Sequence, residues 1–180
     1  MMHPSTPAPR RNIEIKARCA SLEAARAASV QIGARHAGLL EQVDTYFVTP
    51  YGRLKLREIR SADGERAELI AYSRPNEAVA RSSEYHLAAV PDAAATKAAL
   101  AMALGVRGEV RKRRDLYLWH NVRIHLDDVE GLGAFLEFEA VISPSDGEAV
   151  SRERLAALCR ALNVRDEDQI AKSYSDLLNL

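Results

Sequence analysis

Asn12-Ile13-Glu14-Ile15-Lys16-Ala17 is the stretch that decides the fold, because its apolar and polar residues alternate. Successive side chains of a β-strand point to opposite faces, so the alternation predicts a strand that turns Ile13 and Ile15 toward one face. Glu14 and Lys16 then share the other face, where residues two positions apart lie about 6.5–7 Å from each other. The sequence therefore predicts a carboxylate and an ammonium side by side on one strand.

Charged residues on a shared face recur in nearly every segment with strand-like alternation. They are Glu14 and Lys16; Lys55 and Arg57; Lys112 and Arg114; Arg123, His125 and Asp127; and Glu137 and Glu139. In an antiparallel sheet with one buried face, such side chains ordinarily face water. If the strands instead close into a barrel with these faces inward, the interior must hold water, or an anionic ligand with a metal ion, because burying unpaired charges is costly. The pattern alone leaves both arrangements open.

The order of the expected elements favours an α+β fold. We expect strands over residues 13–17, 40–48, 53–59, 67–73, 81–90, 109–119, 122–129 and 134–142. Helices are expected over about 21–33 and 92–104, from a cap at Ser151 onward, and over about 170–178. Two groups of mostly antiparallel strands, each with an inserted helix, predict an eight-stranded antiparallel β-barrel with flanking helices.

Length and composition indicate one globular domain. A chain of 180 residues is near the usual size of a domain, so we expect a single domain over residues 11–180 after a disordered leader, residues 1–10. Hydrophobic residues at 47% and charged residues at 28% argue against a disordered chain. No apolar run approaches the roughly 20 residues of a membrane-spanning helix, and the first residues lack a signal-peptide core. A cytoplasmic protein without a membrane partner is therefore expected.

The charge balance excludes a broad electrostatic attraction to polyanions. The 25 basic and 25 acidic residues give a formal net charge of +0, so we expect no binding of nucleic acid. Cys19 and Cys159 have neither a disulfide framework nor a metal-ligand spacing, and are expected to be buried thiols. Function is expected to depend on the local arrangement of charge.

Several short motifs occur in order along the chain. They are Asn12-Ile13-Glu14-Ile15-Lys16, Asp44-Thr45-Tyr46-Phe47, Leu54-Lys55-Leu56-Arg57, Lys112-Arg113-Arg114, Leu126-Asp127-Asp128-Val129 and Leu132-Gly133-Ala134-Phe135-Leu136-Glu137-Phe138-Glu139. With these motifs, residues 12–178 resemble the CYTH superfamily of triphosphate tunnel enzymes. That superfamily includes class IV adenylate cyclases, thiamine triphosphatases and inorganic triphosphatases.

The resemblance implies a tunnel that binds a triphosphate and a divalent cation, Mg²⁺ or Mn²⁺. The metal ligands implied are Glu14, Asp127, Glu137 and Glu139. The phosphate-binding residues implied are Lys55, Arg57, Lys112, Arg114 and Arg123, with Lys172 of the last helix as a cap over the phosphates. Lys16 occupies the position of the signature lysine, for which the resemblance implies a catalytic role in orienting or deprotonating the attacking water.

The sequence departs from the family pattern at two positions. Asn12 replaces the first signature glutamate, and an amide oxygen is a weaker ligand for Mg²⁺ than a carboxylate. Family members often have Lys-Gly-Pro where this chain has Ser73-Arg74-Pro75, so Arg74 is a candidate for substrate binding in place of the lysine.

Four functions remain open at the level of sequence. The leading hypothesis is metal-dependent hydrolysis of the terminal phosphoanhydride of tripolyphosphate, thiamine triphosphate or ATP by a monomer or homodimer. One alternative is cyclisation of ATP to cyclic AMP and pyrophosphate, which also needs a pocket for the base. Another is a noncatalytic protein that binds a nucleotide or polyphosphate, since Asn12 occupies a ligand position. An interaction protein with solvated strand faces is the least specific interpretation.

Some residues have no assigned role from the sequence. His125 shares the face of Arg123 but is more often structural in such a position, and Tyr46 is expected to be a packing aromatic. Asp44 fits equally well near the metal or at the start of the hairpin, and the pair Glu84 and His86 fits equally well in the tunnel or in water.

Overall fold

The computed structural model describes residues 10–73 and 81–180, and its eight strands form a closed antiparallel barrel. The strands follow one another around the barrel in the order β1-β5-β4-β3-β2-β6-β7-β8, and β8 pairs with β1 to close the ring. The predicted α+β fold with an eight-stranded antiparallel barrel is therefore confirmed. The strands are β1 (Arg10–Arg18), β2 (Arg35–Phe47), β3 (Arg53–Ser61), β4 (Gly64–Ser73), β5 (Arg81–Val90), β6 (Val106–Trp119), β7 (Val122–Val129) and β8 (Gly133–Val141).

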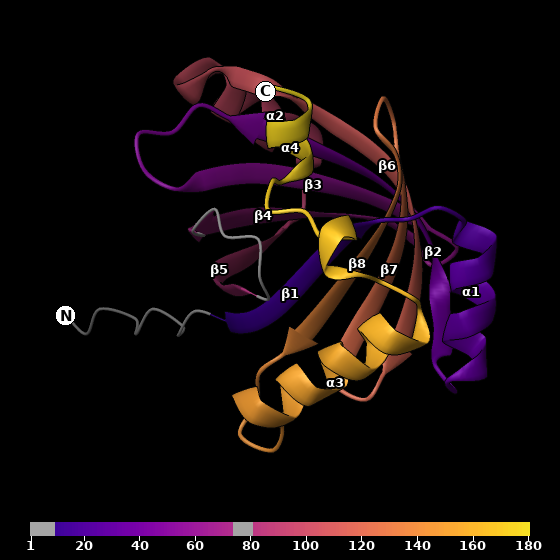
Figure 1. Cartoon of the computed structure of the whole chain (residues 1–180). Coiled ribbons are helices and arrows are strands. Elements are labelled where there is room, and N and C mark those ends of the chain that lie inside the picture. The colour runs from indigo at the N-terminus through magenta and orange to yellow at the C-terminus, as the bar shows by residue number, and fades with distance from the viewer. Residues whose placement is uncertain (1–9, 74–80) are drawn as a thin grey trace.

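The helices pack around the barrel, and within the described residues only the last of them contributes a side chain to the interior. They are α1 (Leu22–Gln31), α2 (Ala93–Leu104), α3 (Glu148–Ala161), the short 3₁₀ helix η1 (Asp166–Asp168) and α4 (Tyr174–Leu177). Figure 1 shows α3 beside β7 and β8, and α2 on the other side of the molecule, near β2 and β3. Within the described part of the chain, no helix has the length and apolar character that crossing a bilayer requires.

The apolar faces of the strands point outward, toward the helices. Ile13 and Ile15 of β1 join a core cluster with Phe138 of β8 and with Leu155 and Leu158 of α3. A separate cluster lies beneath α2 and contains Phe47, Leu56 and Ala67. Because the hydrophobic layers lie between the sheet and the helices, the opposite strand faces, which carry the charges, point into the barrel.

Several predicted boundaries differ from the structure. β1 already includes Arg10, the last residue of the predicted leader; residues 1–9 lie outside the described residues. β2 begins at Arg35 instead of residue 40, with a register shift between His36 and Gly38 that breaks the alternation. The third helix begins at Glu148 after Gly147, so Ser151 is not its cap. Ser151 is buried inside the helix, where its hydroxyl accepts a hydrogen bond from Asn121.

The tight turn between β2 and β3 depends on Gly52. Its φ is 61°, in the left-handed region that residues with a Cβ adopt at a cost. A Cβ at this position would lie 3.1 Å from the carbonyl oxygen of Tyr72. Glycine therefore permits both the turn and the close approach of β4, which fixes the strand that carries Lys55 and Arg57.

Candidate functional site in the barrel interior

A polar cavity of about 320 Å³ lies inside the barrel. All eight strands contribute side chains to its wall, and Ser173 and Tyr174 contribute from the C-terminal segment. The site residues proposed from the sequence that line it are Glu14, Lys16, Lys55, Arg57, Lys112, Arg114, Arg123, Glu137 and Glu139. The structure thus brings together residues that are up to 125 positions apart (Glu14 to Glu139) in the sequence.

One group of charges lies on β2 and β3, around Asp44. Asp44 is opposite Arg57 in the strand register and is 2% exposed. Arg57 donates through Nε to Oδ1 at 2.6 Å and through Nη2 to Oδ2 at 2.7 Å, while Lys55 Nζ donates to Oδ2 at 2.8 Å. Burial alone would raise the pKa of Asp44, but the charges of Arg57 and Lys55 hold this pKa well below its ordinary value.

A second group lies on β6 and β7, around Asp127. Arg114 donates through Nε and Nη2 to the two carboxylate oxygens of Asp127, each at 2.7 Å, and Lys112 Nζ donates at 3.3 Å. The hydroxyl of Tyr174 donates to the same carboxylate at 3.0 Å. Asp127 is fully buried and is not among the residues of the cavity wall. The metal-ligand role expected for Asp127 stays a prediction; in the structure its carboxylate pairs with Arg114, Lys112 and Tyr174.

Glu137 lies where the second group meets β1. Its Oε2 accepts a hydrogen bond from Arg114 at 2.9 Å, and its Oε1 lies 3.9 Å from Lys16 Nζ. Burial opposes ionisation, yet the nearby Lys16, His125 and Arg114 lower the pKa of Glu137 well below its ordinary value. Lys16 also lies 4.0 Å above the ring of Tyr174, which stabilises its charged form.

Glu14 and Glu139 are two neighbouring acidic residues of the wall. They are direct partners across β1 and β8, and like charges in this position destabilise a sheet when no cation is near. Asn12 donates through Nδ2 to Oε1 of Glu139, and Arg123 Nη1 lies 3.3 Å from Oε2. Among the described residues, Oδ1 of Asn12 is buried without a hydrogen-bond partner.

These oxygen atoms fit a hard divalent cation. Mg²⁺ is commonly held by one or two carboxylates, with water and substrate phosphate as the other ligands, and an amide oxygen is also acceptable. Glu14, Glu139 and Oδ1 of Asn12 supply such a set. Across residues 10–73 and 81–180, no three side chains of His, Cys, Asp or Glu gather as a metal cluster. Glu137 and Asp127 are paired with arginine and lysine, and Glu139 lies 3.3 Å from Arg123.

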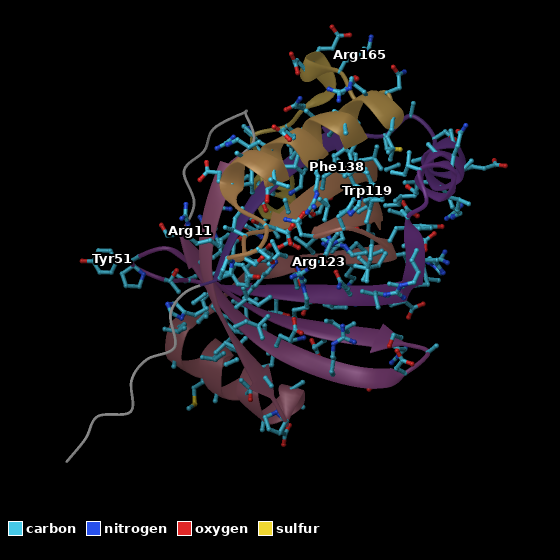
Figure 2. The ribbon with its side chains drawn as sticks, turned by 90° about the horizontal axis from the view of Figure 1, so that it is seen from below. Arg11, Tyr51, Trp119, Arg123, Phe138 and Arg165 are labelled. Atoms are coloured by element: carbon cyan, nitrogen blue, oxygen red, sulfur yellow. The ribbon has the colours of Figure 1, made fainter. Side chains whose placement is uncertain are left out.

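Arg123 reaches the cavity from β7. Figure 2 shows its side chain in the space between the strands, whereas Tyr51 and Arg165 project outward. Lys172, in contrast, is exposed and absent from the cavity wall. It precedes α4 instead of lying within it, because α4 begins only at Tyr174 after the Ser173 cap. Arg74 lies outside the described residues.

A comparison with protein families identifies the family to which this barrel belongs. A sequence model of the CYTH domain matches residues 10–174, which is nearly the whole chain. The chain belongs to the CYTH domain family. The resemblance found in the motifs is thereby confirmed.

Relatives of this CYTH domain include proteins named as cyclases. A protein of Methanocaldococcus jannaschii named "Putative adenylate cyclase MJ0240" is 38% identical over 71 residues. This alignment covers 39% of the chain and only about two fifths of the relative, 41% of its length.

Solved structures share the fold over nearly the whole domain. The PH1012 protein of Pyrococcus horikoshii has a TM-score of 0.78 at 26% identity, covering 92% of this chain and 98% of that one. A "putative adenylate cyclase" of Vibrio parahaemolyticus has a TM-score of 0.77 at 24% identity, covering 94% and 98%. A protein of Hippeastrum, named "Putative adenylyl cyclase HpAC1" and described as having a dominant triphosphatase activity, has a TM-score of 0.64 at 17% identity, covering 94% and 93%. At these identities the last two show the fold alone.

Some residues of the CYTH tunnel wall had no role in the sequence analysis. They are Gln42, Asp44, Tyr46, Arg66, Glu68, Tyr72, Tyr85, His125, Ser173 and Tyr174. Strand alternation could have predicted some of them, since Gln42, Asp44 and Tyr46 share one face of β2 as Glu14 and Lys16 share one face of β1. Strand alternation cannot predict that Ser173 and Tyr174 line the cavity, because they lie outside the strands, in the C-terminal segment. His86, in contrast, is exposed.

His125 is the clearest of these omissions. It is 4% exposed, and its Nδ1 lies 3.7 Å from Glu137 Oε2, too far for a hydrogen bond; the Oε1 of Gln42 also has no hydrogen-bond partner among the described residues. Burial, together with the charge of Arg114, lowers the pKa of His125. Buried polar atoms without partners are rare in folded proteins, so these atoms indicate a cavity that water or a ligand fills.

Proposed function

We propose that this CYTH domain protein hydrolyses the terminal phosphoanhydride of a triphosphate, with Mg²⁺ or Mn²⁺ as its cofactor. The observation that supports the proposal is the composition of one cavity, in which the five side chains proposed to bind phosphate (Lys55, Arg57, Lys112, Arg114, Arg123) share the wall with the acidic pair Glu14 and Glu139. A triphosphate needs cations around its oxygens and a metal ion for the remaining charge, and this cavity supplies residues for both. The described triphosphatase activity of the Hippeastrum protein with the same fold is consistent with it.

The cationic residues bind and align the substrate. Lys55 and Arg57 approach it from β3, and Lys112 and Arg114 from β6, the two strands that flank β2, so the phosphate chain lies along this part of the barrel wall. Because these donors are already oriented by carboxylates, little reorganisation is needed when charge moves toward the leaving oxygen. Lys16, held between Glu137 and Tyr174, orients the attacking water by donating a hydrogen bond.

Glu14, Glu139 and Asn12 would hold the cation. When bound, the cation supplies charge stabilisation on the phosphate oxygens. The carboxylates would then no longer repel each other across β1 and β8, which offsets the cost of their proximity.

Turnover of defined substrates tests the proposal. Purified protein is incubated with tripolyphosphate, thiamine triphosphate or ATP, each with Mg²⁺ or Mn²⁺, and orthophosphate and cyclic AMP are measured. We expect orthophosphate as the dominant product. Failure to release orthophosphate from every triphosphate, under conditions in which the protein is folded, would overturn the proposal.

Two substitutions link this activity to the cavity. Arg57→Ala removes a side chain that donates hydrogen bonds to phosphate, and Glu137→Ala removes the partner of Lys16. Each variant should therefore lower kcat/KM by orders of magnitude. Circular dichroism and thermal unfolding would verify that the variants fold. Wild-type kcat/KM in either folded variant would argue against catalysis in the barrel.

Cyclisation of ATP is the second candidate, because relatives of this chain are named as adenylate cyclases. In that reaction the ribose 3′-hydroxyl replaces water as the nucleophile and pyrophosphate leaves. Cyclic AMP as the main product from ATP would favour this candidate over hydrolysis. Binding of tripolyphosphate without turnover of any substrate would instead favour a noncatalytic binder.

A further inference from the structure

The two groups of charges in the barrel have the same construction. Asp44 is opposite Arg57 on the β2–β3 hairpin, and Asp127 is opposite Arg114 on the β6–β7 hairpin. In each group the arginine donates through Nε to Oδ1 and through Nη2 to Oδ2 of the aspartate. The lysine two positions before the arginine donates to Oδ2 in both. We call each group a Lys-x-Arg arm with its aspartate.

The aspartate holds each arginine by the same edge. A guanidinium has five N–H donors in a rigid plane, and the bidentate pair with the carboxylate uses the edge formed by Nε and Nη2. Within the described part of the chain, Nη1 of Arg57 and of Arg114 makes no hydrogen bond. The end of the guanidinium therefore stays available for a second planar or tetrahedral anion, in an orientation that the aspartate fixes.

The aspartate also competes with that second anion. Asp44 is 2% exposed, and the charges of Arg57 and Lys55 keep it ionised. A negative charge next to the two cations opposes the approach of a polyanion, and in a partly desolvated cavity this repulsion is strong. One carboxylate thus orients the cations and reduces their attraction for phosphate.

We propose that Asp44 is a positioning residue of the tunnel, a built-in anion that orients Lys55 and Arg57 and weakens the ground-state binding of triphosphate. This inference rests on the proposed function. Weaker binding of the ground state costs nothing in catalysis when the transition state keeps its contacts, and it favours release of the anionic product. Asp127 has the same place in the second arm, but its additional contact with Tyr174 makes Asp44 the cleaner residue to test.

Asp44→Asn is the decisive variant, because it removes the charge and leaves the shape nearly unchanged. In calorimetry without a divalent cation, tripolyphosphate should bind about tenfold more tightly to Asp44→Asn than to the wild type, since the ligand replaces the missing anion. In the turnover assay kcat should fall by at least about tenfold, because Arg57 loses its fixed orientation. The melting temperature without ligand should fall, and the upward shift with tripolyphosphate should exceed that of the wild type.

Asp128→Asn is the matched control. Asp128 is adjacent to Asp127 on β7 but exposed, so this variant changes the net charge equally without changing the cavity. Its affinity for tripolyphosphate and its kcat should equal those of the wild type. If Asp128→Asn also binds more tightly, the effect comes from overall charge and the inference is wrong.

Asp44→Glu keeps the charge and moves the carboxylate, so it tests orientation separately. Its affinity should stay within about twofold of the wild type while kcat falls, as expected when charge is kept and geometry is lost. Asp44→Glu still tests the inference if Asp44→Asn does not fold. Tighter binding by Asp44→Glu, or wild-type kcat, would overturn the inference.

The possible outcomes separate the inference from the proposed function. If the wild type hydrolyses triphosphate but Asp44→Asn binds tripolyphosphate no more tightly, the inference fails and the function stands. If no protein turns over any triphosphate but the tenfold difference in affinity appears, the function fails and the anion role of Asp44 stands. Loss of Mn²⁺ binding in Asp44→Asn, measured by calorimetry with the metal alone, would make Asp44 a metal ligand and overturn the inference.

Discussion

Lys112 shows how the barrel interior sets the charge of a single residue. Burial, together with the neighbouring Arg114, lowers the pKa of Lys112 to about 7, despite the carboxylate of Asp127 at 3.3 Å. Desolvation disfavours an ammonium, and a like charge nearby disfavours it further. Lys112 is therefore only partly protonated near neutral pH in the protein without ligand.

Binding of a triphosphate should protonate Lys112. A polyanion near the amine favours the ammonium, so tripolyphosphate binding at pH 7.5 is expected to take up part of one proton and to weaken as the pH rises. Calorimetry in two buffers with different heats of ionisation measures the uptake. Lys112→Met should abolish it, and equal binding heats in both buffers for the wild type would contradict the expectation.

At the scale of elements, α3 supports the barrel from outside and contributes no side chain to the cavity wall. Leu155 and Leu158 are almost completely buried against the outer face of the sheet, in the cluster that includes Phe138. The apolar side of β8 thus packs on α3, while Glu137 and Glu139 on its other side line the cavity.

Leu158→Ala should therefore separate stability from chemistry. The cavity left in this layer is expected to lower the free energy of unfolding by about 2–5 kcal/mol. At temperatures at which the variant stays folded, kcat/KM for a triphosphate should remain near the wild-type value. Urea denaturation and initial rates give the two quantities, and a large loss of kcat/KM in the folded variant would show that α3 controls the interior.

The strands themselves, and the hairpin of β2 with β3, could be predicted from the sequence, but the ends of the strands could not. Alternation located all eight strands because each carries one apolar face, whereas β2 extends back to Arg35 through a bulge that breaks the alternation. The predicted start of α3 was wrong. Serine is a favourable cap by local sequence alone, whereas the hydrogen bond of Ser151 with Asn121 depends on tertiary structure. Parity likewise placed Asp127 on the charged face, but only the fold shows that Arg114 encloses it.

For the whole molecule, ionised interior carboxylates make stability depend on pH. The pKa values of Asp44, Asp127 and Glu137 are all lowered by neighbouring cations, which outweigh the effect of burial. In the unfolded chain these groups titrate at about 3.9 for Asp and 4.3 for Glu. As the pH falls through this range, the unfolded state binds protons that the folded state does not bind, so acid favours unfolding.

The free energy of unfolding should thus be nearly constant with respect to these groups above about pH 5 and fall steeply below about pH 4. Urea denaturation at a series of pH values measures this dependence. Asp44→Asn should show a shallower acid dependence than the wild type, since one of the three groups is gone. An equally steep fall in both proteins would contradict a low pKa for Asp44.

Ring closure has a practical consequence for all of these variants. Among the described residues, each strand pairs with a neighbour on both sides over part of its length, so the sheet offers no strand whose whole edge is open to another chain. Changing a charge in the interior leaves this backbone pairing and the outer apolar layers in place. Variants of the lumen are therefore expected to remain free of aggregates at the concentrations that calorimetry requires, which light scattering can verify before each titration.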